Sequence, residues 1–141
     1  MRYWLMAICF LCGGTLGTGL AGGETRSAGR HEHGSTALGI ALEGQSLVIE
    51  IDGPAANFTG FERKPATEQE KQELARVLNV LRDGASLFLT PPGAQCRLQS
   101  AAVSPPDYGT DGHADLEAFW EFRCGSPAAL TWIEAKVFAA F

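Results

Sequence analysis

Two stretches in the first half of the chain alternate between larger apolar residues and small or polar ones. In residues 36–42 the larger apolar side chains stand at every second position, and residues 47–51 repeat this pattern. A period of two is typical of a β-strand. Only Glu43-Gly44-Gln45 separates the two runs, so they are predicted to pair as an antiparallel hairpin.

A helical period begins after Thr67. The apolar stripe consists of Leu74, Val77, Leu78 and Leu81, which follow the i, i+3, i+4, i+7 spacing. Residues 67–70 read Thr-Glu-Gln-Glu, which is a capping box, and Asp83-Gly84 is a helix stop signal. The pattern predicts one amphipathic helix whose stripe packs on an apolar surface.

The rest of the chain favours short strands. The candidate runs are residues 87–89, 95–103, 115–124 and 129–138. Trp120 and Trp132 are expected to pack in the core or against the sheet. The predicted fold class is therefore α+β, with an antiparallel sheet of about five or six strands and one amphipathic helix packed on it.

The N-terminus is typical of an export signal. Arg2 precedes an apolar run over residues 3–11, and a small-x-small sequence ends at Ala21. This apolar run is too short for a transmembrane helix, which needs about 20 apolar residues. We expect a signal peptide over residues 1–21, a flexible lead-in over residues 22–30, and a single domain with no membrane span over residues 31–141.

Two cysteines remain after the expected cleavage. Cys96 and Cys124 lie in two neighbouring predicted strands, near the start of one and at the end of the next. In an exported protein such a pair is most simply a disulfide. A thiolate pair that binds a metal, or two free thiols, are the alternatives.

Charge and motif content exclude several functions. The chain has 11 basic and 16 acidic residues and no basic run, which argues against nucleic acid and against an anionic membrane surface as partners. It contains none of the common catalytic or nucleotide-binding motifs. Glu62 is a loop carboxylate more typical of a cap or an ion pair than of catalysis, so we do not expect an enzyme.

The three histidines are the residues most suited to binding a metal. His31 and His33 are two positions apart, so in an extended segment both imidazoles point to the same side. His113 is the only candidate for a third nitrogen ligand, as a specific zinc site requires. The carboxylates that could complete the site or orient an imidazole are Glu32, Asp111 and Asp115. The alternative is three solvated histidines at strand ends.

Four sequence segments together resemble one known family. They are His31-x-His33-Gly34, Pro54-Ala55-x-Asn57-Phe58-x-Gly60-Phe61-Glu62, Ala94-x-Cys96-x-Leu98 and His113-Ala114-Asp115. Over residues 31–141 the chain is similar to the ZrgA-like family of periplasmic zinc-binding proteins of Gram-negative bacteria. The resemblance implies a periplasmic location, zinc (Zn²⁺) as the bound ion, and metal-binding roles for His31, His33 and His113. It also implies an association with zinc uptake, with a component of the uptake transporter as a partner.

The chain departs from the family pattern at two places. Members typically have a histidine where this chain has Arg63, and they often carry histidines in the loop that here spans residues 104–112. A guanidinium group cannot bind a metal ion and repels one that is close. The expected function is therefore a zinc-binding accessory protein of reduced capacity.

A metal-independent interaction module is the second hypothesis. It depends on the connection over residues 55–65, where Phe58 and Phe61 are expected to be exposed and to offer a docking edge.

Overall fold

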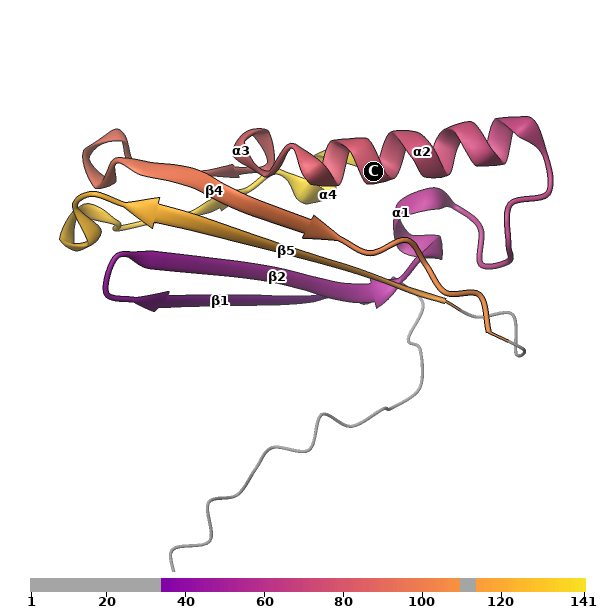
Figure 1. Cartoon of the computed structure of the whole chain (residues 1–141), viewed down its shortest axis with the longest axis horizontal. Helices are drawn as coiled ribbons and strands as arrows, with labels where there is room; N and C mark the ends of the chain where they lie inside the picture. Colours follow the sequence, from indigo (N-terminus) through magenta and orange to yellow (C-terminus); the bar gives the residue numbers. More distant parts are fainter. Residues whose placement is uncertain (1–33, 110–113) are drawn as a thin grey trace, which may run out of the picture.

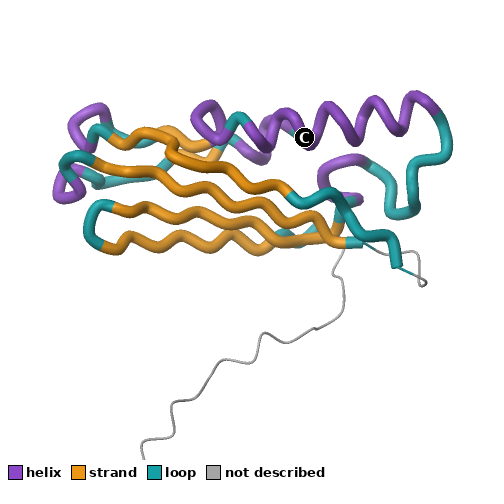
Figure 2. The backbone as a smooth tube through the Cα atoms, viewed as in Figure 1, coloured by secondary structure: helices purple, strands orange, loops and turns teal. Residues whose placement is uncertain are grey.

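The computed structural model describes residues 34–109 and 114–141, without the side chain of Phe138. In this part of the chain a four-stranded antiparallel sheet has the order β1-β2-β5-β4, and helix α2 lies across one of its faces (Figures 1 and 2). The strands are β1 (Ala37–Glu43), β2 (Ser46–Pro54), β3 (Phe88–Leu89), β4 (Cys96–Val103), β5 (Asp115–Cys124) and β6 (Glu134–Ala135). The helices are α1 (Ala56–Thr59), α2 (Glu68–Arg82), α3 (Gly84–Leu87) and α4 (Val137–Ala140), with 3₁₀ turns η1 (Pro92–Ala94) and η2 (Pro127–Ala129). The α+β class is confirmed, although β3 and β6 form a separate two-stranded sheet.

The predicted hairpin is present as β1 and β2. The strands pair in continuous register, with Ile40 opposite Ile49 and Leu42 opposite Leu47, and Gly44 in the turn has a φ of 57°. The row of β2 that faces α2 is fully buried. Its neighbours on β1 remain exposed, because α2 lies over the β4 side of the sheet (Figure 1).

Helix α2 begins and ends where its sequence predicts. Thr67 accepts a hydrogen bond from the Glu70 amide, and the Glu70 carboxylate accepts one from the Thr67 amide, which completes the capping box. Val77, Leu78 and Leu81 are buried against the sheet.

Trp120 of β5 joins the helix to the sheet. Its indole is fully buried, and Nε1–H donates a 2.7 Å hydrogen bond to the carbonyl of Leu81. The ring also packs edge-on against Phe88, with 4.8 Å between ring centroids. Gly84 leaves room for the indole, because a β-carbon there would overlap Cδ1 and Nε1 of Trp120.

The strand predicted over residues 129–138 is wrong. Only Glu134–Ala135 is extended and paired, residues 127–129 form a 3₁₀ turn, and Val137–Ala140 form α4. The partner strand β3 has only two residues and is followed closely by Pro91-Pro92. The rest of residues 129–138 therefore has no strand backbone with which to pair. Trp132 is 48 % exposed and is not a core residue.

The cysteine pair is a disulfide. Cys96 and Cys124 stand opposite each other in the β4–β5 register and are bonded. The bridge joins the start of β4 to the end of β5 and closes the sheet at the end away from α1 (Figure 1).

Replacing Gly84 tests the close packing of the Trp120 indole against this residue. We expect Gly84→Ala to lower the free energy of unfolding by about 1–3 kcal/mol, because the rigid indole must move to admit a methyl group. Gly93→Ala is the matched control, since its methyl group would lie 3.7 Å from Cβ of Ala129, an ordinary contact. Urea unfolding of the two variants measures the difference, and equal stabilities would contradict the account.

Candidate metal centre

The predicted ligands are divided between described and undescribed parts of the chain. Five of them lie outside the described residues: His31, Glu32, His33, Asp111 and His113. Asp115 is described, and it is the exposed first residue of β5, opposite Pro54 of β2. The geometry that bears on the site is therefore that of the residues next to each histidine segment.

Asn57 of α1 holds the residues that directly follow His33. Its side-chain oxygen Oδ1 accepts a 3.0 Å hydrogen bond from the Gly34 amide. Its Nδ2 group donates to the Ser35 carbonyl at 2.7 Å and to Thr36 Oγ1 at 3.0 Å. All three bonds join residues 21 to 23 positions apart in sequence, so one amide side chain ties residues 34–36 to α1.

The residue that follows His113 is held by the start of the same helix. The amide of Ala55, the N-cap of α1, donates a 2.8 Å hydrogen bond to the carbonyl of Ala114. Ala114 is 8 % exposed and belongs to the core. Ala55 and Asn57 are two residues apart, hence within about 7 Å of each other along the backbone. We call residues 34–36, 55–57 and 114–115 together the α1 corner.

The face of the sheet that points away from α2 is acidic next to the α1 corner. Asp52 and Glu117 stand directly opposite each other in the β2–β5 register, and Asp115 lies two positions from Glu117 on the same face. Carboxylates side by side across strands repel one another, which makes this end of the sheet favourable for a cation.

An apolar cavity of about 200 Å³ lies beside the α1 corner, between β1 and the C-terminal residues. Its apolar lining comes from Leu38, Ile51, Phe58, Val137 and Phe141, and Gly34 and Asn57 line its polar side. The cavity adjoins the residues that follow His33, but the described residues that line it include no His, Cys, Asp or Glu side chain.

The prediction that residues 55–65 offer Phe58 as part of an exposed docking edge is wrong. Phe58 is only 7 % exposed and packs edge-on against Phe141, with 5.4 Å between ring centroids. Phe61 is half-buried, and Thr59 accepts a hydrogen bond from its amide and donates one to its carbonyl. The connection therefore buries Phe58 in the core and does not present it as a docking edge.

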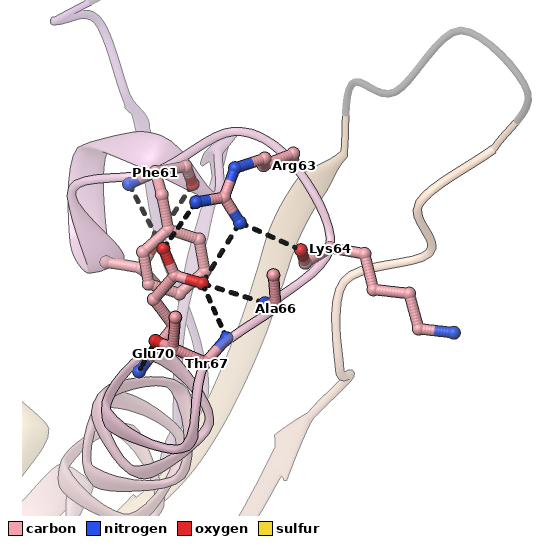
Figure 3. Close-up of polar contacts among 7 residues, drawn as sticks. Phe61, Arg63, Lys64, Ala66, Thr67 and Glu70 are labelled. Carbon is pink, nitrogen blue, oxygen red and sulfur yellow. Dashed lines mark hydrogen bonds and ion pairs between the residues drawn. The ribbon is translucent and has the colours of Figure 1, made fainter.

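Arg63 pairs with Glu70 at the start of α2 (Figure 3). Its Nη2 and Nη1 groups donate to the two carboxylate oxygens at 2.6 and 3.0 Å. Glu70 also accepts from the amides of Ala66 and Thr67. These bonds, first that of Arg63, lower the pKa of Glu70 to about 2. The charge of Arg63 is thus compensated within the α1–α2 connection.

The described residues hold no complete metal site of their own. Among residues 34–109 and 114–141, no three His, Cys, Asp or Glu side chains gather closely enough to hold a metal ion. In the same ranges no helix has both the length and the hydropathy needed to cross a membrane.

Asn57 is the residue whose role the sequence did not reveal. Side-chain amides usually bond backbone within a few residues, so a bond to residues more than 20 positions away has no local signal.

The chain matches the model of a known protein family. A family model described as "ZrgA family zinc uptake protein" matches residues 30–141. A search of curated proteins finds no match.

The Arg63–Glu70 pair predicts a pH dependence. Because the folded protein lowers the pKa of Glu70 from 4.5 to about 2, the pair stabilises the fold above about pH 4.5, and this contribution is lost as the pH falls towards 2. We expect Arg63→Gln to raise the pKa of Glu70, while the amides of Ala66 and Thr67 keep it below 4.5. NMR titration of the carboxyl resonance measures it. Arg76→Gln, which removes the partner of Glu73, is the control and leaves the pKa of Glu70 in place. An unchanged pKa in Arg63→Gln would contradict the pairing.

Proposed function

The chain belongs to the ZrgA family of zinc uptake proteins, and on this premise we propose that it is an exported, periplasmic protein that binds zinc as cargo and assists its uptake. The proposed role is an accessory one without catalysis, and the family description as a zinc uptake protein supports it. The proposed partner is a component of the zinc transporter, which receives the ion.

The proposed ligands are the imidazoles of His31, His33 and His113. The observation that supports this set is the α1 corner, where Asn57 holds the residues after His33 and Ala55 holds the residue after His113. The residues next to two histidine segments, which are 80 positions apart in sequence, are thereby held by two residues of the chain that are two positions apart. Three imidazole nitrogens at about 2.0–2.1 Å are a common ligand set for zinc.

A carboxylate completes the proposed site. Asp115 begins β5 one residue after Ala114, so its side chain starts at the α1 corner. It serves as the fourth ligand or accepts a hydrogen bond from a ligating imidazole, and Glu32 and Asp111 are the other candidates. The acidic pair Asp52 and Glu117 adds attraction for the ion without binding it.

The proposed capacity is one ion per chain. Arg63 occupies the position where the family typically has a histidine, and it is committed to Glu70. Residues 104–112 contain no histidine that would collect further ions.

Calorimetry with zinc tests the ligand set. We expect the chain from residue 22 to bind one zinc ion, and the double variant His31→Ala/His33→Ala to lose this binding, because a single imidazole cannot hold zinc specifically. Binding by the double variant as tight as that of the unsubstituted chain would rule out the assignment.

Asn57→Ala tests the contribution of the α1 corner. Without the amide side chain, residues 34–36 lose three hydrogen bonds, and we expect the zinc affinity to fall by roughly 10-fold, as for residues that support metal ligands. Asn79→Ala is the matched control, because Asn79 is exposed on α2 and its side-chain oxygen accepts a hydrogen bond from Arg82 of the same helix. Circular dichroism shows whether both variants fold. Equal zinc affinities of the two variants would show that Asn57 does not position the site.

A further inference from the structure

Strand β1 is an edge of the sheet without the usual protection against strand pairing. In the described part of the chain its only strand neighbour is β2, and the register between them has no bulge. Its sequence, Ala-Leu-Gly-Ile-Ala-Leu-Glu, contains no proline and no basic residue. Natural edge strands are commonly interrupted by such residues, because a regular edge pairs with other strands.

The other edge strand, β4, differs in each respect. Its register shifts between Leu98 and Ser100, it carries Arg97, and Cys96 is bonded to β5. Helices α2 and α3 also pack beside β4. The lack of protection is therefore particular to β1.

The face of β1 that continues the core is apolar and exposed. Leu38, Ile40 and Leu42 are 37 %, 49 % and 46 % exposed, and they adjoin the buried row of β2. The opposite face carries the small residues Ala37, Gly39 and Ala41. A neighbouring strand would thus meet a flat edge with an apolar row on one side.

We propose that β1 pairs with β1 of a second copy of this chain, antiparallel and centred on Ile40, so that the two sheets form one eight-stranded sheet. In this register Ile40 faces Ile40 of the second copy, and Leu38 faces Leu42. Glu43, the only charged residue of β1, lies opposite Ala37 of the second copy. A parallel pairing would instead place the two Glu43 carboxylates side by side, which is unfavourable.

An apolar cavity lies at one end of this strand edge. Leu38 lines the 200 Å³ cavity beside the α1 corner, together with Phe58 and Val137. Pairing about Ile40 brings Leu42 of the second copy next to Leu38, at the edge of this cavity. Two-fold symmetry repeats the contact, so each copy supplies both the apolar side chain and the cavity.

Residues 22–33 are a poorer occupant than a second copy. Residues 27–33 read Ser-Ala-Gly-Arg-His-Glu-His, so a strand formed by them would bring no large apolar side chain to cover Ile40 and Leu42. The apolar row is matched by β1 itself.

The expected dimer is weak. Three half-exposed side chains and one strand edge per copy bury less than the roughly 1,200–2,000 Å² of a standard interface, so association depends on protein concentration.

Cysteine cross-linking tests the register. The chain from residue 22 contains every described element, and its native cysteines are bonded to each other, so an added thiol reacts alone. We expect Ile40→Cys to form a disulfide-linked dimer under mild oxidation, because directly opposite residues have α-carbons about 4.5–5.5 Å apart. Leu38→Cys is the matched control: its two thiols would start about 13 Å apart, four residues along the strand, and stay unlinked. Mixing Leu38→Cys with Leu42→Cys should restore the cross-link. Equal cross-linking of Ile40→Cys and Leu38→Cys would overturn the register.

Sedimentation equilibrium with a chelator present tests the dimer apart from zinc binding. From about 10 µM to 1 mM the mass should rise from that of one chain towards that of two, a range suited to a weak interaction. Ile40→Lys should stay at the mass of one chain, and Gln99→Lys, the same charge change on exposed β4, should behave like the unsubstituted chain. A single-chain mass for the unsubstituted chain throughout this range overturns the proposal. If a chain beginning at Gly34 then dimerises, the occupant of β1 is residues 22–33.

Discussion

The antiparallel pairing of β2 with β5 is the contact on which the other features depend. It places β5 in the middle of the sheet, where one face carries Trp120 and the residues that pack against α2. The same register sets Pro54 opposite Asp115, so the chain leaves β2 at the point where it enters β5. The core and the α1 corner therefore both depend on one register. A shift by one residue would turn Trp120 to solvent and move Ala114 away from Ala55.

Helix α1 and its N-cap hold the residues of the α1 corner in place. It has only four residues, and its stability comes from what it contacts rather than from its own hydrogen bonds. Ala55 bonds Ala114, Asn57 bonds residues 34–36, and Phe58 is buried in the core. The Arg63–Glu70 pair then fixes the connection to α2. Arg63 thus has a structural partner in the fold.

Local sequence signals predicted most of the elements. The alternation of β1 and β2 and the capping box of α2 each act over a few residues and were confirmed. The Cys96–Cys124 disulfide, expected from the positions of the two cysteines in neighbouring predicted strands, was also confirmed. What failed depends on distant partners. The alternation over residues 129–138 did not reveal that β3 offers only two residues for pairing, nor did Phe58 reveal that Phe141 covers it. For the site, the sequence indicated the three histidines as candidate ligands. Only the fold revealed that Asn57 and Ala55 hold the residues that follow His33 and His113.

The central claim is that the α1 corner brings three imidazoles to one zinc ion. The most direct measurement is the ¹⁵N NMR spectrum of the histidine side chains as zinc is added, with each resonance assigned by substitution. The account predicts that the resonances of His31, His33 and His113 shift together, and that their shift changes are complete at one equivalent of zinc. A His113 resonance that stays unchanged while those of His31 and His33 shift would contradict it, because the two histidine segments would then not share an ion.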